Sequence, residues 1–304
     1  HVVGRGVANT LHVFDPENGH ALVHEFSLGS DLNPQDIAFD AAGLAYVSCY
    51  DAPDLLLVDV DQQQVLQSFS TAAFADADGL PETSWMCAVG QRLFIACQLL
   101  DRDNWYLPTG PGRLLVFDMT SRQWIDADPQ VPGTQAIALQ GANPYTRLET
   151  VDFGGGPQLR VGCAGDYASL DGGIETVDPA TLSSTGYLLT EAELGGDILA
   201  FVTTGADAVH CLTSDASLRT RLSRATVPGG GIQVLDQGAD YVHADLAWDG
   251  GAQLYVADRT VAASGLRVFD ADSGAELTSG SVATALPPSS FILPPSHVSP
   301  VPGT

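Results

Sequence analysis

A short phrase of two strands recurs six times along the 304-residue chain, and it constrains the fold more than any other feature. In a clear copy, the apolar residues 46–49 (Tyr-Val-Ser-Cys) precede a second strand that ends in aspartate, residues 55–59. Corresponding first strands begin at Val2, Tyr46, Phe94, Arg160, Ala208 and Tyr255. The fifth copy is degenerate in its second strand, residues 218–226. Repetition of this kind predicts a repeat architecture, but it does not identify a ligand.

Each copy has the pattern of four short strands separated by Gly, Asn, Asp or Pro, without a 3.6-residue period. In the second copy these strands cover residues 36–39, 44–49, 55–60 and 65–69. Six copies in 304 residues give about 50 residues a copy, a size typical of a four-stranded propeller blade. The sequence therefore predicts an all-β fold, a six-bladed β-propeller of four-stranded blades.

The two ends of the chain complement each other in this scheme. The first copy offers strands at residues 2–6, 11–14 and 22–28 but no innermost strand, whereas residues 290–293 form an apolar strand without a partner. If the C-terminal strand pairs into the N-terminal blade, the ring closes and no sheet edge is left exposed. We therefore expect one propeller domain over residues 1–293 and a Pro-rich C-terminal tail over residues 294–304.

Charge excludes one class of partner. The chain has 12 basic residues, all arginine, against 37 acidic ones, giving a net charge of −25 and a pI near 4.2. Such a chain repels phosphate backbones, so nucleic acid is excluded as a ligand. The charge could serve a cationic or metal-bearing partner, or it could simply keep the protein dissolved in a salty or extracellular medium.

No apolar run reaches the ~20 residues of a membrane span, and no signal peptide is visible at His1. Because the chain begins inside a strand pattern, we expect a leader before it, which could carry a lipid anchor. We therefore expect a secreted or cell-surface protein, with the periplasm as an alternative.

Four segments carry a family resemblance: Tyr-Val-Ser-Cys at 46–49, Tyr-Val-Ala-Asp at 255–258, Phe-Asp-Pro-Glu-Asn-Gly at 14–19 and Val-Asp-Pro-Ala-Thr at 177–181. They resemble the YVTN-type repeat of the YncE-like surface β-propellers, although the Asn of that repeat is replaced in every copy. The resemblance implies a propeller at the cell surface. It also implies a binding function, since some relatives capture metallophores or cobalamin-type cofactors, while others are related to lactonases.

In a propeller, loops that enter innermost strands share one face with loops that leave second strands. This rule gathers a largely acidic rim: Asn33, Asp36, Asp51, Glu82, Asn143, Asp166, Asp171, Asp197, Asp245, Asp258, Arg5 and Arg259. The rim could hold a cation or a polar ligand. For any single residue, the shaping of a turn is the favoured interpretation.

An insertion over residues 98–112 is far longer than a hairpin requires, and it carries the adjacent rings of Trp105 and Tyr106. Residues 165–173 form a shorter counterpart that contains Tyr167. We therefore predict a ligand face that combines these loops with the rim, made by Trp105, Tyr106, Arg102, Asp166, Tyr167, Asp197, Asp245, Asp258 and Arg259.

Calcium is the one cofactor that the sequence suggests. Asp76, Asp78 and Glu82 lie within residues 74–82, where alternate carboxylates precede a glycine. Hard carboxylate oxygens suit Ca²⁺, but the loop is too short for an EF-hand, and a plain turn is the alternative.

Cys49, Cys97, Cys163 and Cys211 occupy one repeat position, which places them too far apart for disulfides or a shared metal. We expect them to be buried small side chains between blades. Cys87, the fifth, should lie opposite Phe94 in its hairpin.

Catalytic patterns are missing from the sequence: the seven histidines are scattered, and neither Gly-x-Ser-x-Gly nor His-Glu-x-x-His occurs. No catalytic residue is assigned. The sequence favours a non-enzymatic binding protein for a small ligand or a surface protein. The alternatives are a structural component of an extracellular assembly, or a Ca-dependent lactonase-like hydrolase. In the hydrolase, the resemblance would place Glu82, Asn143, Asp197 and Asp245 around the metal.

Overall fold

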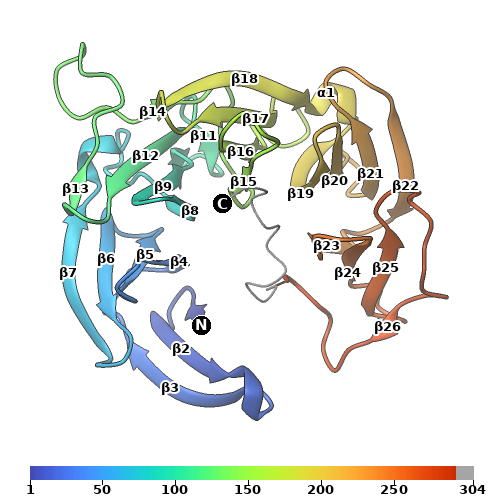
Figure 1. Ribbon diagram of the computed structural model, residues 1–304, viewed down its shortest axis with the longest axis horizontal. Helices are drawn as coiled ribbons and strands as arrows, with labels where there is room; N and C mark the ends of the chain where they lie inside the picture. The colour runs from blue at the N-terminus through green and yellow to red at the C-terminus, as the bar shows by residue number, and fades with distance from the viewer. Residues whose placement is uncertain (292–304) are drawn as a thin grey trace. The chain divides into compact units, whose positions relative to one another are not determined.

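The computed structural model describes residues 1–291. Six of its seven antiparallel sheets are the blades of a six-bladed β-propeller, and Figure 1 labels their strands. Contacts along the chain divide it into two units. Unit 1 comprises His1–Leu148 with Ala180–Ser184, and unit 2 comprises Glu149–Pro179 with Thr185–Thr304. Blades 1 to 3 fall in unit 1. Apart from the start of one strand, blades 4 to 6 fall in unit 2.

In unit 1, each blade is a meander in which neighbours in sequence pair antiparallel. Blade 1 contains β1 (Val2–Gly4), β2 (Thr10–Asp15) and β3 (Ala21–Ser27); blade 2 contains β4 (Pro34–Phe39), β5 (Ala45–Cys49), β6 (Asp54–Asp59) and β7 (Gln64–Ser70); blade 3 contains β8 (Thr83–Val89), β9 (Arg92–Cys97), β12 (Arg113–Asp118), β13 (Gln123–Trp124) and β14 (Ile137–Ala138). Two short 3-10 helices, η1 (Pro16–Asn18) and η2 (Ala72–Phe74), lie in loops.

Unit 2 repeats the same order of pairing. Blade 4 contains β15 (Glu149–Val151), β16 (Gln158–Cys163), β17 (Gly173–Asp178) and β18 (Ser183–Thr190); blade 5 contains β19 (Asp197–Gly205), β20 (Ala208–Ser214), β21 (Thr220–Thr226) and β22 (Ile232–Gly238); blade 6 contains β23 (His243–Trp248), β24 (Gln253–Asp258), β25 (Gly265–Asp270) and β26 (Val282–Ala283). One helical turn, α1 (Glu191–Leu194), precedes β19. The fifth blade is regular despite its degenerate sequence.

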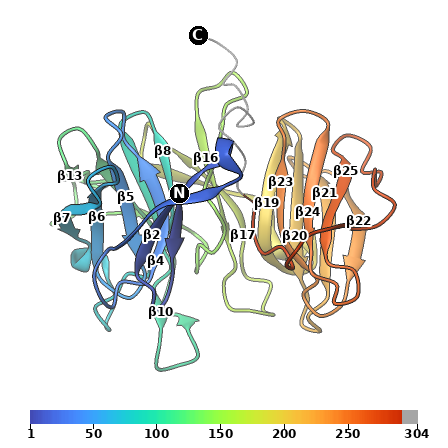
Figure 2. The same ribbon diagram turned by 90° about the horizontal axis from the view of Figure 1, so that it is seen from below.

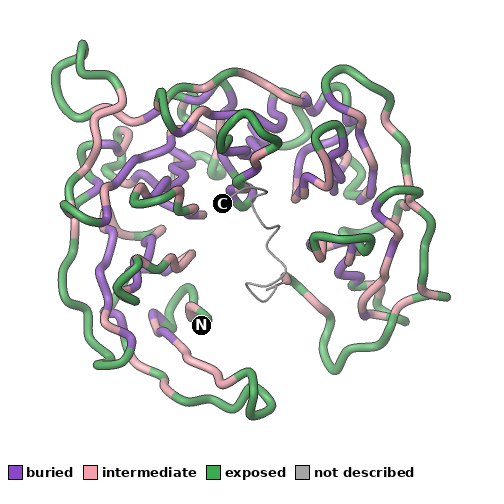
Figure 3. The backbone as a smooth tube through the Cα atoms, viewed as in Figure 1, coloured by how far each residue is buried: buried purple, intermediate pink, exposed green. Residues whose placement is uncertain are grey.

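Burial follows the order of strands within a blade, as the purple segments of Figure 3 show. All five residues of β5 are buried, because its side chains point alternately into the apolar clusters on its two faces. Val47 packs in the cluster with Leu11, and Tyr46 packs in the cluster with Phe117. The fourth strand, β7, is largely exposed, so its sequence is polar.

The aligned cysteines match their prediction. Cys49, Cys97, Cys163 and Cys211 are buried and free, and Cys87 pairs opposite Phe94 in the β8–β9 ladder. Burial raises the pKa of the Cys49 thiol to about 12 and raises that of Cys97 further. Cys49, Cys97 and Cys211 pack as neutral side chains in apolar clusters.

The closing strand predicted at residues 290–293 lies partly outside the described residues. Blade 1 has three strands among residues 1–291, and Ser290 and Phe291 belong to none. Within unit 2, the Phe291 N–H donates to Asp245 Oδ2 at 2.8 Å, and the Phe291 ring lies 6.5 Å from that of Tyr255. Ring closure by this segment therefore stays a prediction. The tail at 294–304 is also outside the described residues.

None of the helices among residues 1–291 has the length and apolar character needed to cross a membrane.

Candidate binding surfaces

The insertion in blade 3 forms a small hairpin. β10 (Leu100–Asp101) pairs with β11 (Leu107–Pro108), and the hairpin extends beyond the ends of the unit 1 sheets (Figure 2). Backbone hydrogen bonds close its turn, because Asp101 O accepts the N–H groups of Asn104 (3.1 Å) and Tyr106 (2.9 Å). The predicted long loop is therefore an ordered hairpin.

Trp105 and Tyr106 form the hairpin tip, between β10 and β11. Trp105 is 91% exposed and Tyr106 52% exposed, as the sequence predicted. Both have left-handed backbones, with φ of 59° and 58°. That conformation costs a non-glycine residue about 1 kcal/mol or more, and such strain persists where the surroundings impose it, often at binding sites.

Arg102, predicted as part of the ligand face, fixes the base of the hairpin. Its Nε donates to Glu82 Oε1 at 2.8 Å, its Nη1 to Asp51 Oδ1 at 2.7 Å and its Nη2 to Tyr50 O at 2.7 Å. The guanidinium also stacks over the Tyr50 ring, 5.1 Å from its centroid. Arg102 and Glu82 thus form a clamp that holds the hairpin to the loop after β5.

Glu82 is the buried half of this clamp. Its carboxylate is fully buried and also accepts the N–H of Leu100 at 3.1 Å. Burial raises the pKa of Glu82 to about 7, against the opposing effect of Arg102. A carboxylate buried to this degree needs its partner, because an unpaired charge there would carry a large desolvation cost.

The three predicted calcium ligands do not converge. Glu82 faces Arg102, Asp76 Oδ2 accepts the Thr109 hydroxyl at 2.6 Å, and Asp78 Oδ1 accepts the Leu80 N–H at 2.8 Å. Over residues 1–291, no group of three or more His, Cys, Asp or Glu side chains is arranged to hold a metal ion. Calcium binding stays a prediction, without support from this geometry.

In unit 2, the loop at 165–172 brings three predicted residues together. Asp197 Oδ2 accepts the Ala168 N–H at 2.8 Å, while Tyr167 stands 48% exposed above. Asp166 accepts a hydrogen bond from the Ser169 hydroxyl at 3.3 Å and lies near Asp197. Burial, followed by the charges of Asp171 and Asp166, raises the pKa of Asp197. The carboxylate of Asp197 therefore holds the loop, and Tyr167 is the exposed one of the three predicted residues.

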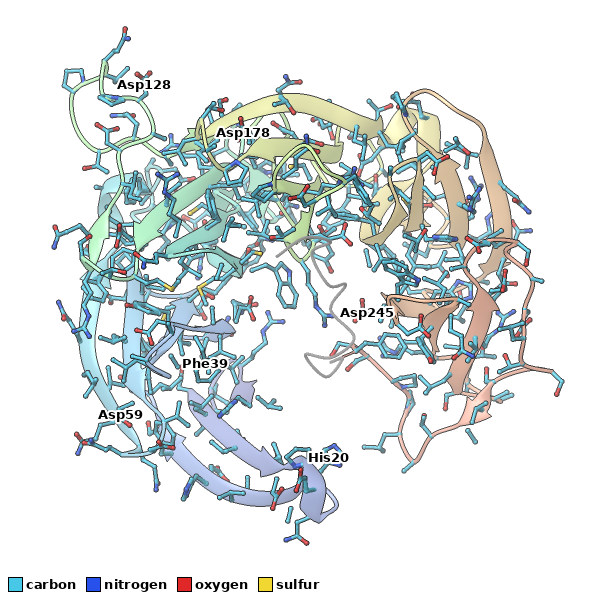
Figure 4. The ribbon with its side chains drawn as sticks, viewed as in Figure 1. His20, Phe39, Asp59, Asp128, Asp178 and Asp245 are labelled. Carbon is cyan, nitrogen blue, oxygen red and sulfur yellow. The ribbon has the colours of Figure 1, made fainter. Side chains whose placement is uncertain are left out.

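The remaining predicted residues lie in blade 6. Asp245, labelled in Figure 4 on β23, accepts the N–H groups of Leu246 (2.9 Å) and Phe291 (2.8 Å). Asp258 is buried and accepts the Thr260 N–H at 2.7 Å, a turn contact. Only Arg259 of this group has an exposed side chain.

The sequence did not indicate a buried polar network in unit 2. His243 Nδ1 lies 3.0 Å from Thr220 Oγ1, and its Nε2 lies 2.9 Å from Asp236 Oδ2, which Arg267 also contacts. A hydroxyl, an imidazole and a carboxylate in series suggest a catalytic triad. However, Thr220 is fully buried, so no substrate can reach its oxygen. The network stabilises the contact between blades 5 and 6.

A second network joins blades 4 and 5. The Thr203 hydroxyl donates to Glu149 at 2.5 Å and accepts from Arg160 Nη1 at 2.5 Å. Burial raises the pKa of Glu149 to about 7. An arginine between Leu159 and Val161, inside an apolar strand, was the one available sequence signal for such a network.

Comparisons with known proteins support the fold. No protein-family model and no curated protein matches the chain. Among solved structures, hydrazine synthase of Kuenenia stuttgartiensis matches with a TM-score of 0.62 at 15% identity, over 87% of this chain and 71% of that chain. The Dos1 propeller matches with a TM-score of 0.54 at 12% identity, over 90% of this chain and 62% of that chain.

The β-propeller domain of Cps50 (Swd1) from Myceliophteria thermophila matches with a TM-score of 0.51 at 12% identity, over 90% of this chain and 80% of that chain. At these identities the likeness is one of fold alone, and the fold hosts unrelated functions. A β-propeller is therefore shown, whereas the assignment to the YVTN-repeat family stays a prediction.

Proposed function

We propose that this protein is a non-enzymatic binding protein of the cell surface or the extracellular space, and that its hairpin tip contacts a protein partner. One observation carries the proposal: two adjacent aromatic rings stand in solvent on a hairpin whose base is clamped. Aromatic side chains lose little conformational entropy on binding and dominate the energy of many interfaces. The core does not need them, since Trp105 is 91% exposed.

The clamp supports this proposal because it holds the tip in place before a partner arrives. A preorganised surface loses less free energy to ordering when it binds. The net charge of −25 favours a partner with a basic surface, since opposite charges accelerate encounter.

The test compares the double variant Trp105→Ala/Tyr106→Ala with the parent protein. Partners are captured from the surface fraction of the source cells, identified by mass spectrometry and purified, and their affinity is measured by calorimetry. We expect the double variant to bind the partner about thirtyfold more weakly, a loss of roughly 2 kcal/mol, with a melting temperature within about 2 °C of the parent.

A matched control removes two neighbouring exposed apolar side chains elsewhere, Leu22 and Val23 of β3, which are 51% and 50% exposed. Leu22→Ala/Val23→Ala should keep full affinity. The proposal is wrong if the tip variant binds as tightly as the parent, or if the two double variants lose affinity equally.

A further inference from the structure

A cleft lies on blade 3, and none of the predicted ligand or metal residues lines it. Its volume is about 370 Å³, within the usual range for small-molecule sites. Its walls are η2 (Ala72–Phe74) and the loop at 132–136, and Arg113 of β12 and Ala138 of β14 also line it. The loop continues from the segment that carries Asp128, labelled in Figure 4.

Arg113 is the one charged residue of the lining. Its Nη1 donates to the carbonyl oxygen of Phe74 at 3.0 Å, which fixes the guanidinium against η2. Among residues 1–291 the Arg113 side chain forms no ion pair, and its other guanidinium N–H groups have no hydrogen-bond partner. By contrast, Arg102 forms ion pairs with two carboxylates and Arg267 with three.

Arg113 shares this lack of a carboxylate partner with Arg221, but only Arg113 lines the cleft. The nearby acids of the loop are committed elsewhere. Asp126 Oδ1 accepts the N–H groups of Asp128 (3.1 Å) and Gln135 (2.9 Å), and neither aspartate lines the cleft. The lining therefore offers a single positive charge.

Both walls are formed without a ligand. The Phe74 ring is buried and packs against Trp124 with centroids 5.3 Å apart. On the other side, the Gln135 amide donates to Pro132 O at 2.9 Å, and Ala127 N donates to Gln135 O at 2.9 Å. Thr134 is exposed, and its hydroxyl has no partner within residues 1–291.

We propose that this cleft binds a small organic monocarboxylate. The planar guanidinium of Arg113 matches a carboxylate, the Thr134 hydroxyl can add a hydrogen bond, and the Ala73, Ala136 and Ala138 side chains suit a compact apolar body. Polyanions such as nucleotide phosphates are disfavoured, because the whole molecule carries a charge of −25.

The test uses benzoate, hexanoate and pyruvate as probes, with benzamide as the neutral counterpart of benzoate. Binding to the full chain is followed by NMR of labelled alanine methyl groups. We expect at least one carboxylate to bind with a Kd of about 1 mM or tighter, shifting Ala73, Ala136 and Ala138. Benzamide should leave these signals unchanged.

Two variants should each weaken that binding at least tenfold. Arg113→Gln removes the cation, and Thr134→Trp fills the cleft from its exposed side and leaves Arg113 in place. The matched control is Arg221→Gln, because Arg221 also donates Nη1 to a backbone carbonyl, that of Leu194 at 3.4 Å, and lies outside this cleft. Its binding should equal that of the parent.

The proposal is overturned if no carboxylate binds, if benzamide binds as well as benzoate, or if the shifts fall on other alanines. It is also overturned if folded Arg113→Gln keeps the parent affinity, or if Arg221→Gln weakens binding as much. Should Arg113→Gln fail to fold, Thr134→Trp decides: unchanged affinity in that variant contradicts the proposal.

Discussion

Two glutamates of α1 show how the environment of one residue sets its effect on stability. Glu191 is fully buried without a cation and accepts the N–H groups of Gly172 (2.9 Å) and Ile198 (2.8 Å). Burial raises its pKa from 4.5 to about 7. Glu193 lies at the surface and forms a capping box with Thr190, the N-cap of α1. The hydrogen bonds that Thr190 donates to the Glu193 carboxylate lower its pKa.

The two should therefore have opposite pH dependence. Between pH 4.5 and about 7, the unfolded chain releases the Glu191 proton and the folded protein keeps it, so this residue lowers the free energy of unfolding as the pH rises. The stabilisation that Glu193 contributes is fully present above its unfolded-state pKa, and it is lost as the pH falls through its lower folded-state pKa. Urea unfolding of the parent, Glu191→Gln and Glu193→Gln at a series of pH values measures the free energy of unfolding. The two substitutions should change its pH dependence in opposite directions, and a change in the same direction would contradict the prediction.

Arg102 provides a second prediction at this scale. Replacing it with Met leaves Glu82 buried and unpaired, so we expect a loss of about 3 kcal/mol in the free energy of unfolding. The double variant Arg102→Met/Glu82→Gln should regain part of that loss, because it removes the buried charge as well. Chemical denaturation measures all three proteins. A double variant less stable than the single one would show that the clamp does not act through the Glu82 charge.

At the scale of elements, aspartates on the innermost strands of blades 2 and 6 make the same contacts. Asp36 accepts the N–H of Ile37 and that of Met86, which lies in the innermost strand of the next blade. Asp245 accepts the N–H of Leu246 and that of Phe291. Phe291 thus makes with Asp245 the contact that Met86 makes with Asp36. This parallel is consistent with the sequence prediction that residues 290–293 supply the innermost strand that blade 1 lacks.

Deletion of residues 289–304 should then expose a sheet edge and cause aggregation or a large fall in melting temperature. Deletion of residues 294–304 alone is the matched control, and we expect it to melt like the parent. Size-exclusion chromatography and calorimetry distinguish the two. If the longer deletion stays monomeric with unchanged melting, the strand does not close the ring.

The strands that the sequence predicted well are those whose environment is uniform. β5 is a continuous buried run because its two faces pack in two apolar clusters. β10, β11 and β14 have only two residues each, too few for a periodic pattern, and they exist because a partner strand lies beside them. Local patterns cannot predict such elements.

The contrast between local patterns and distant partners also explains which features of the candidate sites could be predicted. Exposure of Trp105 and Tyr106 could be predicted because an insertion needs no core. The pairing of Arg102 with Glu82 and Asp51 could not, since those partners lie 20 and 51 residues away in sequence. The Arg113 cleft was missed because η2 and the loop after β13 have separate sequence patterns.

For the whole molecule, the net charge of −25 dominates the electrostatics. Like charges repel one another in the folded protein, and salt reduces this repulsion because the Debye length falls from ~30 Å at 0.01 M to ~3 Å at 1 M. We expect the melting temperature at pH 7.5 to rise with NaCl over this range. The rise should shrink near pH 4.5, close to the pI of 4.2. A melting temperature that falls with salt at pH 7.5 would contradict this expectation.

The four aligned thiols can report the local opening of individual blades. Cys49, Cys97, Cys163 and Cys211 lie in blades 2, 3, 4 and 5, and each is buried and free. A buried thiol reacts with an alkylating reagent only when its surroundings open, so the rate at each cysteine gives the opening free energy of one blade. Four alkylation rates from a single unmodified sample thus form a map of stability around the propeller, with no engineered label.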